Sequence, residues 1–139
     1  MLRDFMQTPV HICMPSSTLA MAAREMEARN VGSLLVVDDE EQIVGIVTDR
    51  DLALCLGHGC IPDTTVGEVM SRHVATIPAD ASLEDAAAVM DSHAVRRLPV
   101  VDAAGKAIGI VCLDDLYSFL TQETITLAGV IRSQGTPQR

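Results

Sequence analysis

The chain has 139 residues and a net charge of −9, and its apolar fraction of 48% comes mainly from aliphatic, Ala and Met residues. The acidic charge argues against a general nucleic-acid binder, because neutralising phosphates needs a basic face, and aromatic residues for base stacking make up only 2%. No apolar run approaches a membrane span, and charged residues stand where a signal peptide would be apolar, so we expect a cytoplasmic protein.

The first half of the chain predicts a regular series of short elements. An apolar stripe of Leu19, Ala22, Ala23 and Met26 predicts an amphipathic helix. Two continuous apolar runs separated by an acidic turn predict a hairpin of buried strands. In order, we expect a helical turn at 2–6, a strand at 10–13, a helix from 18 to 30, strands at 34–37 and 43–47, and a helix from 48 to 57.

The second half repeats the first at an offset of 64 residues. Without gaps, 2–52 aligns with 66–116, and sixteen of the 51 pairs are identical. Ser82 and Asp85 also have the spacing of a capping box. Because a duplicated unit needs its partner to bury its open face, we expect two units that pack together. We divide the chain into 1–60, 61–122, and a C-terminal helix with a disordered tail at 123–139; the apolar helix suggests a homodimer.

Gly45-Ile46-Val47-Thr48-Asp49-Arg50-Asp51 and its second copy at 109–115, with the strand 97–102, resemble a tandem pair of cystathionine-β-synthase (CBS) domains, called a Bateman module. The resemblance covers about residues 1–122. It implies an α/β (α+β) fold of two β-α-β-β-α units packed sheet to sheet with pseudo-two-fold symmetry. It also implies that an adenosine compound (AMP, ADP, ATP or S-adenosylmethionine) binds in clefts between the units and that the signal passes to an effector protein.

A first candidate cleft is built on Thr48 and Asp51. An aspartate in the first turn of a helix can accept hydrogen bonds from both ribose hydroxyls. The helix N–H groups, together with the Thr48 hydroxyl, can bind a phosphate. The same spacing is nearly a capping box, which needs no ligand, and both interpretations stay open. The resemblance adds expected ligand contacts from the preceding strand and from the other unit: Val31, Gly32, Ser33, Ile77 and Pro78.

A second candidate cleft is built on Asp115, with Arg96 and Arg97 on the adjacent strand. Because neighbouring strand residues face opposite ways, we expect only one of the arginines to point in, toward ligand phosphates. Cys112 stands where the family pattern has Thr or Ser, so this cleft lacks a hydroxyl and we expect the two clefts to differ. Met14 and Val31 are the expected adenine contacts here.

The four cysteines are expected to be free thiols in a cytoplasmic protein, with Cys13 and Cys112 in the core. Cys55, His58 and Cys60 fall within six residues and suggest a metal or thiol sensor as an alternative. Structural zinc needs four ligands, and no fourth is near in the sequence, so we predict no metal site.

The sequence therefore predicts a regulatory ligand-sensing module. We expect no enzyme, because the chain has neither a nucleophile elbow nor a Walker loop. We expect no required cofactor, an adenine nucleotide as regulatory ligand, an effector protein as partner, and neither nucleic acid nor membrane as partner. The alternative is a ligand-free dimerisation scaffold in which Thr48 and Asp51 are only helix caps.

Overall fold

The computed structural model describes residues 2–118, and the C-terminal helix and tail predicted at 123–139 lie outside them. Residues 113–118 are helical. The other elements, in chain order, are η1 (Leu2–Asp4), β1 (Ile12–Cys13), α1 (Leu19–Arg29), β2 (Ser33–Val37), β3 (Ile43–Thr48), α2 (Asp49–Gly57), η2 (Val66–Glu68), β4 (Ile77–Pro78), α3 (Leu83–His93), β5 (Arg97–Val101) and β6 (Ala107–Cys112).

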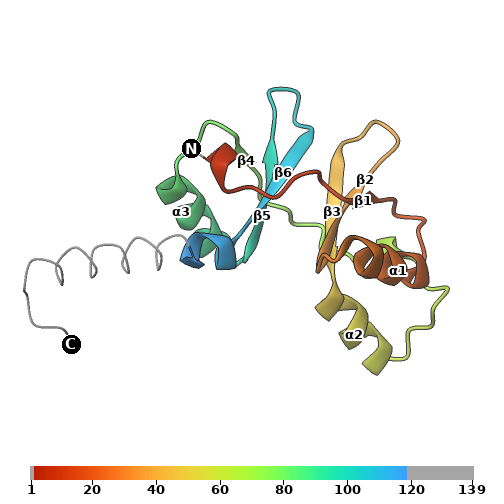
Figure 1. Cartoon of the computed structure of the whole chain (residues 1–139). Helices are drawn as coiled ribbons and strands as arrows, with labels where there is room; N and C mark the ends of the chain where they lie inside the picture. The colour runs from red at the N-terminus through yellow and green to blue at the C-terminus, as the bar shows by residue number, and fades with distance from the viewer. Residues whose placement is uncertain (1, 119–139) are drawn as a thin grey trace, which may run out of the picture.

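The elements form two units of the same topology, each built on a three-stranded sheet. The strand orders are β1-β2-β3 and β4-β5-β6, with the first pair of each sheet parallel and the second antiparallel. Figure 1 shows the two hairpins standing side by side, with the helices on the outer sides. The predicted α+β fold of two repeated units is therefore confirmed.

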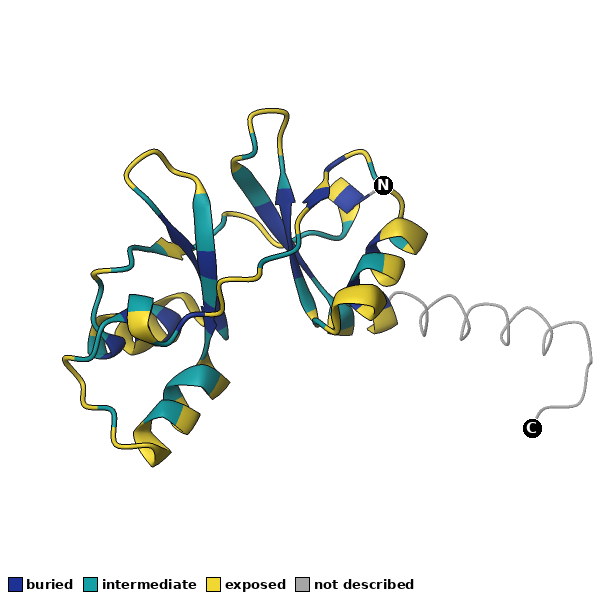
Figure 2. Cartoon of the chain, turned by 180° about the vertical axis from the view of Figure 1, so that it is seen from behind, coloured by how far each residue is buried: buried dark blue, intermediate teal, exposed yellow. Residues whose placement is uncertain are grey.

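The sheets are covered on both faces. Leu34 and Val36 point into the core beneath α1, whereas Leu35, between them, is equally buried on the opposite face. Pro99 of β5 is fully buried in the same way, so each sheet turns one face to the other unit (Figure 2). The hairpin turns also meet, because Lys106 Nζ donates to Glu41 Oε2 over 3.0 Å.

The helices bury a narrower stripe than the sequence predicts. Leu19, Ala22 and Met26 of α1 are buried, but Ala23 is exposed, and so is the equivalent Ala87 in α3. Each step along a helix turns the side chain by about 100°, which carries the residue after Ala22 out of the contact with the sheet. The prediction that Ala23 belongs to the buried stripe is wrong.

Helix starts follow the predicted caps. The Thr18 hydroxyl accepts from the Met21 amide over 3.2 Å. Ser82 and Asp85 form the complete capping box, with bonds of 3.0 and 3.1 Å, as their spacing predicts. The caps satisfy N–H groups that have no partner inside the helix.

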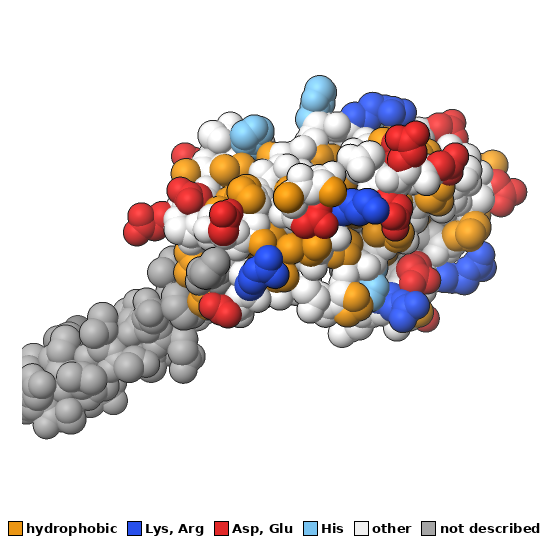
Figure 3. Space-filling model, turned by 90° about the horizontal axis from the view of Figure 1, so that it is seen from above, with side chains coloured by type: hydrophobic (Ala, Val, Ile, Leu, Met, Phe, Trp, Pro, Cys, Tyr) orange, Lys and Arg blue, Asp and Glu red, His pale blue; other side chains and the backbone are white. Residues whose placement is uncertain are grey.

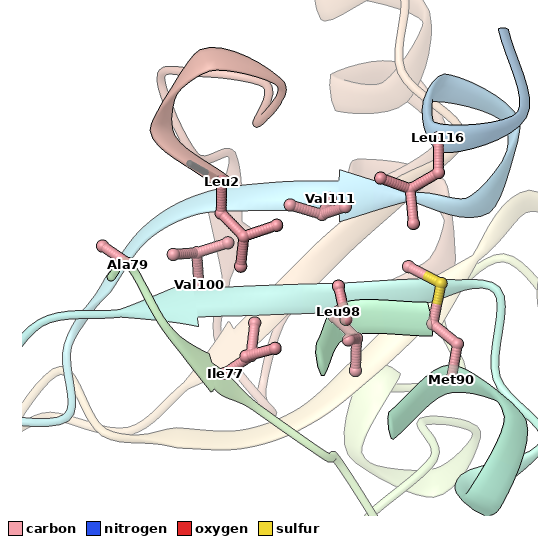
Figure 4. Packing of buried hydrophobic residues seen from close by; sticks show 9 residues of the cluster. Leu2, Ile77, Ala79, Met90, Leu98, Val100, Val111 and Leu116 are labelled. Carbon is pink, nitrogen blue, oxygen red and sulfur yellow. The ribbon is translucent and has the colours of Figure 1, made fainter. Parts of the chain in front are cut away.

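The core of each unit is completed by a segment from the other repeat. Leu2 of η1 is fully buried among the core residues of the second unit, including Ile77, Leu98 and Val111 (Figure 4). Val66 of η2 is fully buried in the core of the first unit. The N-terminal turn of each repeat therefore packs into its neighbour.

The exchanged segments explain the glycine in the repeated phrase. A Cβ on Gly45 would lie 2.6 Å from Met70 Sδ, and a Cβ on Gly109 would lie 2.6 Å from Met6 Sδ. Only glycine leaves room for these methionines. Immediately after them, Gln7 exchanges backbone hydrogen bonds of 2.7 and 3.1 Å with Ile110 of the second unit.

Cys55 and Cys60 form a disulfide across the turn that ends α2, with their Cα atoms 5.3 Å apart. The expectation that these two are free thiols is wrong. The turn at 57–59 reverses the chain, so that the Cys60 amide donates to the Cys55 carbonyl over 3.0 Å and the sulfur atoms meet. Cys13 and Cys112 are free and half-buried, and burial raises the pKa of Cys13 to about 11.

Candidate functional site

Two hollows lie where the units meet. The first, which we name the Asp115 cleft, has a cavity volume of about 260 Å³. It takes walls from both units, and its lining residues are Gln7, Pro9, Val10, His11, Asn30, Val31, Gly32, Ser33, Arg96, Arg97, Ile110, Cys112, Asp114 and Asp115. Segments far apart in the sequence, at 7–11, 30–33, 96–97 and 110–115, thus form one surface.

The second hollow, which we name the Asp51 cleft, has a volume of about 200 Å³. Its lining residues are Ile46, Thr48, Asp51, Ser71, His73, Val74, Ala75, Val95, Arg96 and Arg97. Most of these stand 64 residues from their counterparts in the Asp115 cleft, as Thr48 does from Cys112 and Asp51 from Asp115. The two clefts are therefore related by the repeat but carry different side chains.

The Thr48 and Asp51 pair forms a capping box at the start of α2. The Asp51 amide donates to Thr48 Oγ1 over 3.1 Å, and the Thr48 amide donates to Asp51 Oδ2 over 2.9 Å. The capping interpretation of this spacing is confirmed. It leaves room for a ligand, because an ionised carboxylate accepts at both oxygens and the cap uses Oδ2.

Asp115 occupies the equivalent position without a hydroxyl partner at residue 112. Its Oδ2 accepts instead from Gln7 Nε2 over 3.0 Å, which ties the N-terminal segment to the helix start at 113. The thiol of Cys112 lines the same cleft. Burial and the neighbouring Asp115 raise the pKa of Cys112, although Arg97 opposes this shift, so the thiol is neutral at pH 7.

Arg96 and Arg97 both line both clefts. The expectation that only one arginine points in is wrong, because β5 begins at Arg97 and the alternation of strand side chains does not extend to Arg96. Arg96 Nη2 donates to Asp114 Oδ1 over 3.1 Å. On the face seen in Figure 3, blue Lys and Arg side chains are interspersed with red Asp and Glu, without a broad basic patch.

The predicted contact residues are divided differently from the expectation. Val31 lines the Asp115 cleft, where it is also expected, and Gly32 and Ser33 lie with it; none of the three lines the Asp51 cleft. Ile77 is buried in the core of the second unit, and Pro78 lies exposed on β4 outside both clefts. Met14 lines a separate pocket beside Cys13 and α1. Residues 31–33 are near Thr48 and Asp51 in the first unit, yet they line the cleft of Asp115, because the packing of the two sheets decides which residues line each cleft.

Sequence reasoning missed the segments that follow the exchanged turns. Gln7 and His11 contribute to the Asp115 cleft, and Ser71 and His73 contribute to the Asp51 cleft. The 64-residue offset is the signal that connects these segments, since residues 7–11 align with 71–75. Asp114 also belongs to the Asp115 cleft, where it pairs with Arg96.

The metal-sensor alternative loses its ligands in this structure. The disulfide occupies both thiols of the Cys55, His58 and Cys60 set. Within residues 2–118, no group of three or more His, Cys, Asp or Glu side chains is arranged to hold a metal ion. The same part of the chain has no helix with the length and hydropathy needed to cross a bilayer.

Comparison with protein families decides which fold family this is. The model of the CBS domain matches the chain twice, at residues 2–58 and 66–122. The chain belongs to the CBS-domain family. Each CBS match begins at the turn that packs into the opposite core and includes the helix-start aspartate of one cleft.

CBS-domain proteins of known sequence and structure resemble this pair over most of its length. The chain is 40% identical over 116 residues to the CBS domain-containing protein YhcV of Bacillus subtilis (strain 168), covering 83% of this chain and 81% of YhcV. The CBS pair of protein MJ0100, solved with 5-methylthioadenosine and S-adenosylmethionine, has a TM-score of 0.81 and 26% identity over 88% of this chain and 97% of that one. CBSX2 in complex with AMP has a TM-score of 0.70 and 30% identity over 87% and 96%.

Other curated relatives contain more than the CBS pair. The matched segment makes up 66%, 53% and 24% of the length of three of them. In those proteins the CBS pair is accompanied by further sequence.

Proposed function

We propose that this chain is a regulatory module that binds an adenosine-containing ligand, such as AMP, ADP, ATP or S-adenosylmethionine, between its two CBS units. The observation that carries the proposal is the Asp115 cleft, which brings a helix-start carboxylate and two guanidinium groups into one hollow. Carboxylates accept ribose hydroxyls, and guanidinium groups pair with phosphates. The ligands of MJ0100 and CBSX2 support the same class of compound.

In this proposal, the aspartates hold the ribose and the arginines hold the charged end of the ligand. Asp51 and Asp115 are both half-buried at helix starts, where the N–H groups of the first turn favour anions. Val31 and Ile110 supply apolar surface for the adenine in the Asp115 cleft. The Asp51 cleft offers Ile46 and Val95 at the matching places.

We also propose that the module acts through other proteins in the cytoplasm, as a homodimer and with an effector. Large apolar side chains exposed on and beyond α2 support a protein contact surface. They are Leu54 with 52%, Leu56 with 60% and Ile61 with 59% of the residue surface exposed. The second candidate function, a ligand-free scaffold, is favoured by the complete capping box of Thr48 and Asp51.

A thermal-shift panel of AMP, ADP, ATP, S-adenosylmethionine and NAD separates these two functions. A ligand at a hundredfold excess over its Kd adds about 2.7 kcal/mol to the free energy of unfolding. For a chain of this length, that free energy raises Tm by about 9 °C. The absence of a shift with all five compounds would refute the nucleotide proposal and leave the scaffold.

Two variants separate the cap from the ligand site. Asp51→Ala removes both a cap and a ribose contact, and we expect it to weaken binding in the Asp51 cleft by about tenfold or more, equivalent to about 1.4 kcal/mol. Asp85→Ala is the matched control, because it removes the equivalent capping carboxylate from α3, outside both clefts. Both variants lose cap stability, about 1 kcal/mol, but only the first loses affinity. Asp115→Ala tests the other cleft.

A further inference from the structure

The two clefts draw on the same cationic groups. Arg96 and Arg97 line the Asp115 cleft and also the Asp51 cleft. Within the described residues, no other Lys or Arg lines either cleft; His11 in the first and His73 in the second are the remaining basic side chains. Two phosphorylated ligands would therefore have to be neutralised by one pair of guanidinium groups.

The carboxylates that face these arginines are unequally distributed. The Asp115 cleft contains Asp114 and Asp115, which balance the two guanidinium charges. The Asp51 cleft contains Asp51 alone. Asp49 Oδ2 also stands 3.2 Å from the position that a Cβ on Gly32 would take, beside Arg97. A phosphate therefore meets no excess positive charge in the first cleft and one excess positive charge in the second, and that charge comes from the shared arginines.

The two arginines differ in how firmly they are held. Arg97 lies on the Asp115 side, where its charge opposes the raised pKa of Cys112 and where its Nη2 stands 3.3 Å from the position that a Cβ on Gly32 would take. Arg96 and Asp114 form an ion pair whose side chains are 69% and 85% exposed. Such an exposed pair is weak, so Arg96 can exchange Asp114 for a phosphate at little cost.

We propose that Arg96 and Arg97 couple the two clefts negatively, so that a phosphorylated ligand in one cleft lowers the affinity of the other for a second. This inference rests on the proposed function and adds its regulation. A guanidinium that holds the first phosphate is not available to the second, and the two phosphates repel each other. When Arg96 turns to the Asp51 cleft, it also leaves Asp114 unpaired beside the Asp115 cleft. An uncharged nucleoside has no phosphate to pair with an arginine or to repel a second ligand, so it binds the two clefts independently.

Isothermal titration with AMP and with adenosine tests the coupling. Because the clefts are unequal, the affinity of each is first measured with the other cleft weakened, in Asp115→Ala and in Asp51→Ala, at AMP concentrations that fill only the intact cleft. We expect the second AMP to bind the wild-type protein at least about tenfold more weakly than AMP binds the weaker cleft alone, within the usual range of coupling between sites. Adenosine should show no such difference between the wild-type protein and the variants.

The results separate failure of the inference from failure of the proposed function. If AMP binds both clefts of the wild-type protein with the affinities measured singly, or if only one cleft ever binds AMP, the coupling is refuted and the nucleotide module stands. If neither AMP nor adenosine binds the wild-type protein, both proposals fall.

One further variant tests the role of the ion pair. Asp114→Asn removes the carboxylate that a displaced Arg96 would leave unpaired. Because that exposed pair is weak, we expect the coupling to fall by only about twofold while adenosine binding is unchanged. Glu25→Gln is the matched control, since it removes a carboxylate from another exposed ion pair, 2.8 Å from Arg29 on α1, outside both clefts. Equal coupling in Asp114→Asn and Glu25→Gln would refute the part assigned to Arg96.

Discussion

Val66→Ala tests whether η2 belongs to the core of the first unit. Val66 is fully buried there although the sequence assigns it to the second repeat. The change removes two methyl groups, at about 0.8 kcal/mol for each buried group, and the cavity that remains brings the loss of stability to about 2–3 kcal/mol. Unfolding entropy of about 2.1 cal/mol/K per residue converts this into a fall in Tm of about 7–10 °C.

Urea unfolding and calorimetry measure that loss, and hydrogen exchange locates it. The control is Ile61→Ala, on the same connecting segment, where the side chain is 59% exposed and the expected loss is below about 0.5 kcal/mol. The amides of β2 in the first unit should lose protection in Val66→Ala. If Val66→Ala costs no more than Ile61→Ala, η2 does not complete the first core and the exchange of segments is refuted.

Three further predictions follow from the packing and the thiols. Gly45→Ala places a methyl group 2.6 Å from Met70 Sδ and should cost about 1–3 kcal/mol in urea unfolding, whereas Gly57→Ala, with open space around it, should cost nothing. Cys60→Ser opens a disulfide loop of sequence separation five and should cost about 2 kcal/mol; reductant should destabilise the wild-type protein alone. Burial raises the Cys13 pKa from 9.0 to about 11, so the unfolded chain releases this proton first, and the stability that Cys13 contributes should fall between pH 9 and 11. A Cys13→Ala variant with an unchanged pH profile, or alkylation at pH 9 as fast in the folded as in the unfolded chain, would contradict this assignment.

Local sequence signals predict the elements of this fold well, because the forces that make them are local. The apolar runs at 34–37 and 43–47 mark β2 and β3 within one residue at each end. Ser82 and Asp85 mark the start of α3. Each of these patterns depends only on residues within four positions of one another, so it is visible in the sequence itself.

The sequence does not indicate in the same way which elements pack against each other. Nothing in the turn at 2–6 indicates that Leu2 is buried against Ile77 and Val111, more than 70 residues away. The repeat predicts that two units pack together, but it does not say that their first turns change places. That choice depends on the shape of both cores at once.

The candidate site shows the same division. The sequence predicts Asp51 and Asp115 as equivalent helix-start carboxylates, and both line clefts between the units. It assigns Gly32 to the wrong cleft relative to the structure, because the nearest strand in sequence is not the nearest wall in space. Whether these carboxylates hold a ribose stays a prediction.

The exchange of first turns also bears on how such a protein arises. A single unit of this kind would leave an apolar socket open where its neighbour's Leu2 or Val66 belongs. Two separate copies could fill these sockets in a symmetric dimer, in which the first turn of each copy packs into the core of the other. Joining the copies into one chain keeps this exchange within a single molecule, so we expect either unit, expressed without the other, to be unstable.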